Sequence, residues 1–539
     1  MSTLIPLLLR FRWLTALLAG VMAAFGYQPW GLWPLTLLGT GLLLWLTAKS
    51  LRKRQAFFIG WVFGAGHFCW GLQWIAVAFT FQGTMPAWLG YVSVFALSLY
   101  LAVAPALAML GAFWTLRLNA RAGPASVYGY VLAAAGFWTI TEWLRSWVFT
   151  GFAWNPLSVS MLETPVASSA TAIGTYGASG VVVIISAVCI GLLAAIVEGR
   201  GKLIIERLFN LVAVAAASWL LGWAASGAEL RADFTANTVT IAQPNISQEE
   251  RNDSTLEDAN IAKLVRQSGR EDSDSAPRLL LWPESAIPWY LESGYPFRYY
   301  QFQPGENAQA TRRAVAGLLG PQDILLTGND RLIFDNGQIV AAYNSVTAMT
   351  ADADIIGWYN KAHLVPYGEY LALRWLLEPL GAARLVPGTL DFWPGPGPQT
   401  VKLGAGLPNA GIQICYEIIF SGQVVDAANR PDFIFNPSND AWFGDVGPPQ
   451  HLAQARLRAI EEGLPVLRST PTGISAVIGA DGRILKSLPL GVAGRIDTDI
   501  PAATTPTWFA RMGNTLPVGV ALLLIAIAII PVARKRRRS

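Results

Sequence analysis

Three side chains with complementary chemistry each follow a short run of apolar residues. Cys415, Glu284 and Lys361 all come after such runs, in the second half of a chain of 539 residues. Runs of this length and composition are typical of buried strands. Each side chain is therefore expected where a strand gives way to a turn, so that three strand ends converge on one pocket.

The three residue types together suit acyl transfer. A thiol with an ordinary pKa of about 8.5 needs a base or a positive neighbour before it acts as a nucleophile. The apolar residues 280–283 predict burial that raises the pKa of Glu284 towards neutrality, which would suit a general base. The ammonium of Lys361 suits the oxyanion of a tetrahedral intermediate. The set predicts a thioester on Cys415.

Each of these residues also has an ordinary structural interpretation. A single cysteine after a buried strand more often packs than reacts, and a lone glutamate or lysine is more often a solvated charge or a surface ion pair. His363 and His451 offer a rival pairing, in which a histidine activates Cys415. His363 lies inside the lysine segment and His451 follows a Gly-Pro loop, so we expect neither to be the base.

Composition divides the chain into two parts. Of 35 acidic residues, four lie in residues 1–227, within long apolar runs, and the remaining 31 lie in residues 228–510, against 21 lysines and arginines. The first part is predicted to be a membrane region and the second a water-soluble domain whose negative charge argues against nucleic acid as a partner. Cys69 and Cys189 lie in apolar segments, and Cys415 has no thiol partner in the soluble part. Neither a disulfide, a metal nor a cofactor is expected.

Eight apolar runs are long enough to cross a bilayer of about 30 Å. They lie near residues 12–28, 30–48, 56–80, 88–116, 126–147, 172–197, 204–226 and 514–533. Basic residues cluster before the first span and after spans two, four, six and eight, which places both termini in the cytoplasm. The predicted domains are 1–227 with seven helices, 228–510 as an outer domain, and 511–539 with the last helix and a basic tail.

The outer domain alternates short strands with amphipathic helices, which predicts an α/β fold. The predicted strands are 238–242, 279–282, 324–327, 341–348, 355–358, 412–414, 433–436, 475–478 and 484–488, and the predicted helices 254–268, 308–319 and 450–462. Residues 271–277 and 386–400 are predicted loops. Residues 373–380 are equally consistent with a lipid-facing arm and with an ordinary helix.

An aromatic loop at residues 147–157 separates the fifth and sixth spans. Aromatic residues prefer the headgroup level, so the loop is interpreted first as an interfacial belt, with docking of the outer domain as the alternative. His67, Glu142 and Arg145 are ionisable groups in or beside spans and are functional candidates on that ground. Because Glu142 and Arg145 are three residues apart on a helix, an ion pair between them is expected.

Four ordered motifs in the outer domain resemble those of the nitrilase superfamily. They are Leu281-Trp282-Pro283-Glu284, residues 359–370 from Tyr359-Asn360-Lys361 to Gly368-Glu369-Tyr370, Ile414-Cys415-Tyr416-Glu417, and residues 436–443 from Asn436-Pro437-Ser438-Asn439 to Phe443. Together with the eight spans and an outer domain before the last one, they make the chain similar to the apolipoprotein N-acyltransferase family of the bacterial inner membrane.

The resemblance implies a role for each residue of the motifs. Glu284 would be the general base, Lys361 would stabilise the tetrahedral intermediate, and Cys415 would be the nucleophile. Supporting roles fall to Glu369, Tyr416 and Glu417. Asn436, Asn439 and Asp440 either line the pocket or form an ordinary turn, and we favour the turn. Members of the family often have phenylalanine at the position of Tyr367, a departure that leaves these roles unchanged.

The resemblance also implies the fold and the substrates. An αββα sandwich would be inserted between the seventh and eighth membrane helices and face the periplasm. The acyl donor would be a phospholipid, the acceptor a diacylated apolipoprotein, and the enzyme a multi-pass monomer in the bilayer without a cofactor. A membrane-tethered amidase, in which water resolves the thioester, remains the alternative. A transporter with a solute-binding outer domain would predict more charges and broken helices within the spans.

Overall fold

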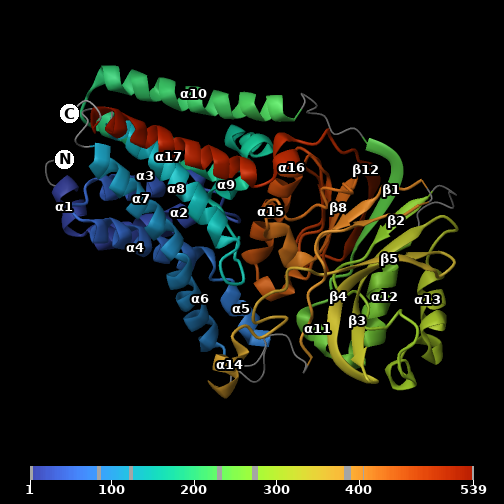
Figure 1. The fold of residues 1–539 in the computed structure, drawn as a ribbon. Coiled ribbons are helices and arrows are strands. Elements are labelled where there is room, and N and C mark those ends of the chain that lie inside the picture. The colour runs from blue at the N-terminus through green and yellow to red at the C-terminus, as the bar shows by residue number, and fades with distance from the viewer. Residues whose placement is uncertain are drawn as a thin grey trace. The chain divides into compact units, whose positions relative to one another are not determined.

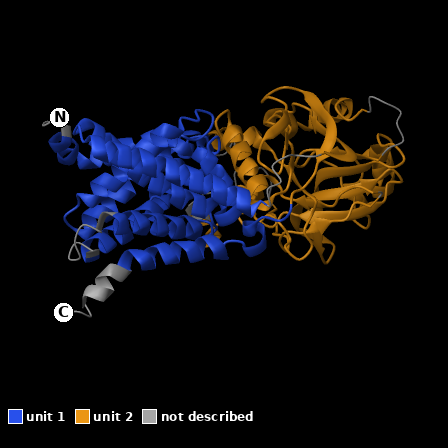
Figure 2. Cartoon of the chain, turned by 90° about the horizontal axis from the view of Figure 1, so that it is seen from above, with its two compact units in different colours: residues 1–76, 87–229, 505–539 blue, residues 77–86, 230–504 orange. Residues whose placement is uncertain are grey.

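The computed structural model describes residues 4–81, 86–119, 126–226, 234–269, 277–380, 390–404 and 406–536. The chain forms two compact units (Figure 2): unit 1 comprises residues 1–76, 87–229 and 505–539, and unit 2 comprises residues 77–86 and 230–504. Several sequence-based expectations lie outside the described residues. These are the loop at 271–276, the first part of the loop at 386–400, and the boundary between residues 227 and 228.

Unit 1 consists of helices (Figure 1). Its α-helices are α1 (Leu4–Arg10), α2 (Arg12–Ala24), α3 (Trp33–Ala48), α4 (Lys53–Gly71), α6 (Trp88–Leu101), α7 (Val103–Asn119), α8 (Ser126–Arg145), α9 (Ala170–Val197), α10 (Gly201–Ala225), α16 (Trp508–Met512) and α17 (Thr515–Arg536), and α5 (Ile75–Ala78) spans the boundary with unit 2. Many of them are apolar throughout, as expected for segments that leave water.

Three helices in the described part of the chain are long and apolar enough to cross a membrane, by length and composition. They cover Trp88–Leu118, Pro165–Val197 and Gly201–Ala225. A fourth follows if α4 and residues Ile75–Phe81, which are bent by 52° relative to each other, form one span. Arg12–Ala24, Trp33–Ala48 and Thr515–Ile529 are shorter apolar helices. Unit 1 therefore contains several apolar helices.

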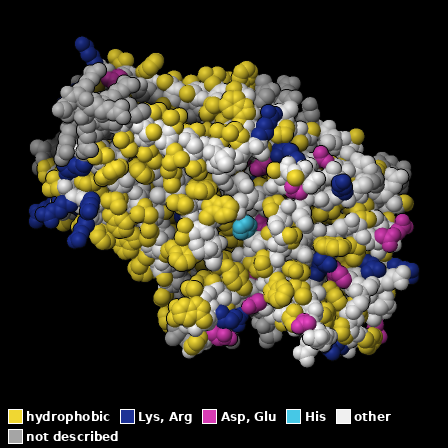
Figure 3. Space-filling view, viewed as in Figure 1, with side chains coloured by type: hydrophobic (Ala, Val, Ile, Leu, Met, Phe, Trp, Pro, Cys, Tyr) yellow, Lys and Arg dark blue, Asp and Glu magenta, His cyan; other side chains and the backbone are white. Residues whose placement is uncertain are grey.

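Small residues allow the helices of unit 1 to approach closely. A Cβ atom on Gly20 in α2 would lie 2.0 Å from the carbonyl oxygen of Phe63 in α4, a separation that only glycine permits. The helices also share a core of buried alanine, leucine and aromatic side chains. In the view of Figure 3, hydrophobic side chains cover much of the surface of unit 1, whereas acidic and basic side chains are scattered over unit 2.

Unit 2 contains two six-stranded sheets. The first has the order β12-β1-β2-β3-β4-β5 and the second β11-β10-β9-β8-β7-β6. The strands are β1 (Phe234–Gln243), β2 (Arg278–Leu281), β3 (Ile324–Asp335), β4 (Gln338–Thr350), β5 (Ile355–Asn360), β6 (Thr400–Val401), β7 (Ala410–Ile412), β8 (Phe433–Pro437), β9 (Val466–Ser469), β10 (Ala476–Ile478), β11 (Ile484–Ser487) and β12 (Gly494–Pro501).

The central strands of each sheet run parallel. In the first sheet β1, β2 and β3 are parallel, and in the second β7, β8 and β9 are parallel. All four residues of β2 are buried, as expected for a parallel strand covered on both faces. The carboxyl ends of parallel strands meet at one edge of a sheet, which is where α/β proteins place their ligands. Glu284 and Cys415 follow β2 and β7 at these edges.

Helices cover the outer faces of the two sheets. One apolar cluster joins side chains from both sheets, and a second joins the first sheet to α12 (Glu257–Arg266) and α13 (Ala308–Ala316) (Figure 1). The helix α15 (Gly447–Glu462) contacts the second sheet at β9. The residue after this helix, Gly463, has a left-handed backbone conformation that ends the helix. Unit 2 thus has sheets and helices in the layered α/β arrangement that the sequence predicts.

Nine strands lie at or next to their predicted positions, and three were missed. The missed strands are β6, β9 and β12. β6 has two residues, and β12 carries charged residues at Arg495, Asp497 and Asp499, which mask its apolar alternation. β9 has four residues and includes the arginine Arg468, so no apolar run marks it. Predicted strand 412–414 is displaced, since β7 ends at Ile412.

Candidate active site

Glu284, Lys361 and Glu369 form a buried cluster in unit 2. The Nζ of Lys361 lies 3.0 Å from Oε1 of Glu369 and 3.4 Å from Oε1 of Glu284. All three side chains are at least nine-tenths buried. An ammonium between two carboxylates balances most of the charge, which a buried group requires. The structure therefore brings together two predicted site residues and one predicted supporting residue.

Backbone geometry fixes Glu284 at the end of β2. A Cβ atom on Gly328 of β3 would lie 2.3 Å from the backbone nitrogen of Ser285, so only glycine allows β3 to lie against the turn that carries Glu284. The backbone N–H of Ala286 donates to the carbonyl oxygen of Gly328 at 2.8 Å, which holds the turn on the strand. The carboxylate position is thus set by the sheet rather than by a free loop.

Asn344 of β4 connects the two carboxylates of the cluster. Its Nδ2 donates to Oε1 of Glu284 at 2.8 Å and to Oε1 of Glu369 at 2.9 Å. The backbone N–H of Asn439 donates to Oε2 of Glu284 at 2.7 Å, and that of Val365 donates to Oε2 of Glu369 at 2.8 Å. Sequence reasoning missed Asn344, although a single amide within the predicted apolar strand 341–348 was a usable signal.

The pKa of Glu284 is lowered, not raised. Burial alone would raise it, but the ammonium of Lys361 and the hydrogen bonds from Asn344 and the Asn439 backbone stabilise the carboxylate more strongly. The prediction that burial brings this pKa towards neutrality was therefore wrong. Burial opposes the charged form of Lys361 as well, yet Glu369 and Glu284 raise its pKa above the ordinary value. Both groups are charged at neutral pH.

Cys415 is buried beside this cluster in a strained backbone conformation. Its φ of 50° is in the left-handed region, which residues with a Cβ rarely adopt. Burial and the negative charge of Glu284 raise the pKa of its thiol, while Lys361 opposes the increase. The thiol is thus close enough to both side chains for their charges to act on it, and it is neutral in the resting protein.

Glu417 joins the turn that carries Cys415 to the turn that follows Lys361. Its Oε2 accepts from the backbone N–H of Ile414 at 2.7 Å. Its Oε1 accepts from the hydroxyl of Tyr359 and the backbone N–H of Ala362, both at 2.7 Å. Burial raises the pKa of Glu417 to about 7. Its contacts give the predicted supporting residue a positioning role between the two turns.

Tyr416 and the two histidines occupy different environments. Tyr416 packs against Phe420 with ring centroids 5.1 Å apart. The ring of His363 stacks on Phe420 as well, with ring centroids 4.3 Å apart. The Nε2 of His451 lies 3.0 Å from the carbonyl oxygen of Cys415, so this nitrogen donates to the backbone rather than accepting the thiol proton. These contacts disfavour a Cys-His pair.

The turn after β8 contributes to the site. Asp440 lies 2.9 Å from Nδ1 of His451 and accepts from Nη2 of Arg468 at 2.6 Å. The Nδ2 of Asn436 donates to the carbonyl oxygen of Gln413, two residues before the cysteine, at 2.6 Å. These side chains support the cysteine turn, and the Asn439 backbone contacts Glu284 directly. These side-chain contacts agree with the favoured structural role of Asn436, Asn439 and Asp440.

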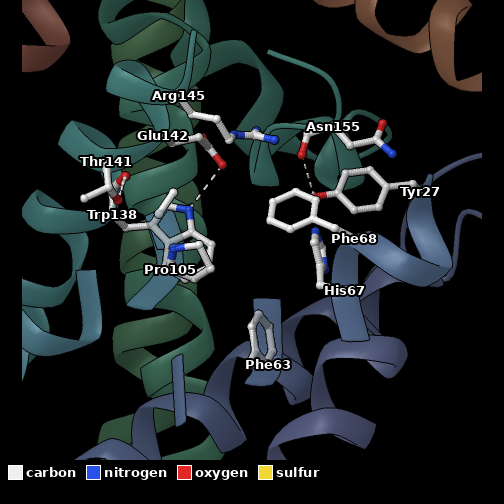
Figure 4. Close-up of a pocket in the computed structure, with 11 residues that line it drawn as sticks. Tyr27, Phe63, His67, Phe68, Pro105, Trp138, Thr141, Glu142, Arg145 and Asn155 are labelled. Atoms are coloured by element: carbon white, nitrogen blue, oxygen red, sulfur yellow. Dashed lines mark hydrogen bonds between the residues drawn. The ribbon is translucent and has the colours of Figure 1, made fainter. Parts of the chain in front are cut away.

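A second buried cluster of ionisable groups lies in unit 1 and lines a cavity of about 20 Å³ (Figure 4). Oε1 of Glu142 accepts from the backbone N–H of Leu157 at 2.9 Å, and Nη1 of Arg145 donates to the carbonyl oxygen of Trp154 at 2.9 Å. Within the described residues no hydrogen bond or ion pair joins Glu142 to Arg145, contrary to the expected ion pair. The hydroxyl of Tyr27 lies 3.3 Å from Nε2 of His67.

Comparisons with known proteins define the class of unit 2 and then the family of the chain. Residues 238–509 match the family model described as carbon-nitrogen hydrolase, so unit 2 is of the carbon-nitrogen hydrolase class. Residues 19–188 match the model described as apolipoprotein N-acyltransferase N-terminal domain. With both matches in this order, the chain belongs to the apolipoprotein N-acyltransferase family.

Curated relatives support the same assignment over nearly the whole length. The apolipoprotein N-acyltransferase of Rhodopseudomonas palustris is 34% identical, with 97% of this chain and 95% of the relative covered. That of Bradyrhizobium diazoefficiens is 33% identical over the same shares, and that of Shewanella oneidensis is 31% identical with 98% and 96% covered. The resemblance found in the sequence motifs is confirmed.

Proposed function

We propose that this protein transfers an acyl chain from a phospholipid to the amino group of the N-terminal diacylglyceryl-cysteine of apolipoproteins. The observation that carries the proposal is the buried Glu284–Lys361–Glu369 cluster beside a strained Cys415, in a chain of this family. A nucleophile, a carboxylate and an ammonium held by fixed backbone are what acyl transfer through a thioester requires.

The first half of the reaction would form a thioester on Cys415. The sulfur attacks the ester carbonyl carbon of the phospholipid while Glu284 takes the thiol proton, and the ammonium of Lys361 stabilises the oxyanion. Because the pKa of Glu284 is lowered and that of Cys415 raised, proton transfer must accompany attack rather than precede it. The intermediate then expels the lysophospholipid alkoxide, which takes the proton from Glu284.

The second half would transfer the chain to the acceptor amine. The neutral amine attacks the thioester carbon, Glu284 accepts a proton from the nitrogen, and the tetrahedral intermediate collapses to the amide. The departing thiolate of Cys415 takes that proton and returns to the thiol. The net change is one ester broken and one amide formed, with no external acid or base consumed.

The membrane arrangement is part of the proposal. Helices occupy each of the eight predicted ranges, and we infer eight spans with unit 2 inserted between the seventh and eighth. The domains are 1–227, 228–510 and 511–539, with unit 2 in the periplasm, both termini in the cytoplasm, and a monomer in the bilayer. Such tethering replaces a three-dimensional search, since both substrates are membrane-anchored.

An assay with purified full-length protein in phospholipid vesicles tests this function. Adding a synthetic diacylglyceryl-cysteine peptide should give a triacylated peptide whose new chain is on nitrogen, with one lysophospholipid released for each chain transferred. A Cys415→Ala protein is the control for background. Release of free fatty acid without an acylated peptide would instead support the amidase, in which water resolves the thioester.

A further inference from the structure

The backbone carbonyl of Cys415 is held by a buried histidine from another segment of unit 2. His451 lies in α15, and its Nε2 is 3.0 Å from this carbonyl oxygen. A carbonyl oxygen only accepts hydrogen bonds, so Nε2 carries a proton and donates it. Both residues are buried, which keeps water from replacing the ring as the donor. His451 therefore acts on the cysteine through its backbone and not through its thiol.

The contact is made to a strained part of the backbone. A residue with a Cβ keeps a φ of 50°, as Cys415 does, only where surrounding contacts hold it there. The peptide groups on either side of its Cα set this conformation. The carbonyl oxygen of the preceding group, that of Ile414, accepts from the N–H of Glu417 at 3.2 Å, within the same turn. The following group is held by His451, from outside the turn.

A buried ion pair fixes the ring of His451. Its Nδ1 lies 2.9 Å from Oδ1 of Asp440 and 3.1 Å from Nη2 of Arg468. The same Nη2 donates to Oδ2 of Asp440 at 2.6 Å, and Nη1 donates to the hydroxyl of Ser438 at 2.9 Å. The side chains of the ion pair and of the histidine are 0% exposed. A buried polar network with its hydrogen bonds satisfied is rigid, so the ring has one orientation.

We propose that His451 is a positioning residue for the nucleophile: by holding the carbonyl oxygen of Cys415, it keeps the thiol beside Glu284 and Lys361. The inference rests on the proposed function and deepens it, because it concerns the nucleophile of that reaction. Without this hydrogen bond the peptide group after Cys415 turns, the backbone strain relaxes, and the sulfur moves away from the base. A displacement of about 1 Å at a reacting group can lower a rate about 10²-fold.

Two amides that differ by one methylene group test the proposal. In His451→Gln the amide nitrogen reaches the place of Nε2 and can donate to the carbonyl oxygen of Cys415. In His451→Asn the amide reaches only the place of Nδ1, beside Asp440. Per folded protein, the rate of Cys415 acylation by phospholipid should stay within about threefold of wild type in His451→Gln and fall about 10²-fold in His451→Asn. The KM for phospholipid should not change in either variant.

Alkylation of Cys415 by iodoacetamide, measured by mass spectrometry of its peptide, reports on the thiol without any acyl transfer. Burial and the charge of Glu284 raise the pKa of this thiol, Lys361 opposes the increase, and Asp440 adds to it. A sulfur that leaves this site should have a pKa closer to the ordinary value of about 8.5. Alkylation of His451→Asn should therefore begin at a lower pH than in wild type, and His451→Gln should follow wild type.

A matched variant on the same helix controls for disturbance of the core. Gln454 is buried in α15, three residues after His451, and donates to the carbonyl oxygen of Gln450 at 3.4 Å. Gln454→Leu should change neither the acylation rate nor the pH dependence of alkylation. His451→Ala also removes the donor and provides a second test if His451→Asn does not fold. Thermal unfolding of each variant measures folding separately.

Two results would overturn the inference. One is an equal acylation rate in His451→Gln and His451→Asn, whether both are normal or both are low. The other is the same pH dependence of alkylation in wild type and His451→Asn. In either case acylation of Cys415 in wild type would leave the proposed function standing. If wild-type Cys415 is not acylated at all, the proposed function fails, and the alkylation comparison still decides whether His451 positions the thiol.

Discussion

Unit 1 and unit 2 each bury an acidic side chain near a basic one, and the two clusters differ in what those side chains bind. In unit 1, Glu142 and Arg145 bind the backbone of Leu157 and Trp154, which lie 15 and 9 positions away in the sequence. In unit 2, Glu284 and Lys361 bind each other although 77 positions separate them. A backbone-directed cluster holds a loop, whereas a cluster of side chains from separate strands can present charge to a substrate.

The cavities next to the two clusters differ in volume. The cavity beside Glu142 has about 20 Å³, room for about one water molecule, and the cavity beside Glu284 has about 370 Å³. Ionisable residues in membrane helices are functional candidates by default, yet here their charges are used within unit 1. The comparison teaches that the partners of a buried charge, more than its burial, indicate its role.

The largest expected effect is in the unit 2 cluster. Lys361→Met should lower the rate of Cys415 acylation by about 10²- to 10³-fold, because it removes the charge that stabilises the oxyanion. It also leaves two carboxylates facing each other, so the rate must be measured per folded protein. Lys263→Met, which removes a partly exposed ion pair with Glu250, is the control and should have a normal rate. Near-normal acylation in Lys361→Met would remove the lysine from the mechanism.

The corresponding change in unit 1 should affect stability instead of chemistry. Glu142→Gln weakens the acceptor for the Leu157 N–H and should cost about 1–3 kcal/mol, lowering the thermal unfolding midpoint by several degrees. The acylation rate of the folded protein should remain within about twofold, well below the tenfold change that about 1.4 kcal/mol would cause. Glu206→Gln, at an exposed site, is the control and should change neither the unfolding midpoint nor the acylation rate. A large loss of rate with an unchanged midpoint would contradict the comparison.

The sequence predicted that Glu284 and Lys361 lie close together, but it did not predict the electrostatics of this pair. Cys415, Glu284 and Lys361 stand out because each ends an apolar run, a local pattern. Asn344 was missed because its two carboxylate partners lie 60 and 25 positions away. The direction of the Glu284 pKa was also missed, since it depends on distances to Lys361 and to the Asn439 backbone that only the folded chain defines.

The same limit applies to the fold. Runs of buried apolar residues such as β2 were predicted, because a parallel central strand is apolar on both faces. β9 and β12 were missed because β9 contains the buried Arg468, whose partners Asn436, Ser438 and Asp440 come from another part of the chain, and β12 carries alternating charges. Strands whose polar residues are satisfied by distant partners leave no local signal.

Acylation of Cys415 is the central claim, and mass spectrometry measures it most directly. Full-length protein incubated with a phospholipid of defined chains, without acceptor, should gain the mass of one acyl group on the peptide that contains Cys415. The adduct should be labile to hydroxylamine, absent in Cys415→Ala, and discharged when diacylglyceryl-cysteine peptide is added. An unmodified Cys415 in protein that still N-acylates the peptide would contradict the account.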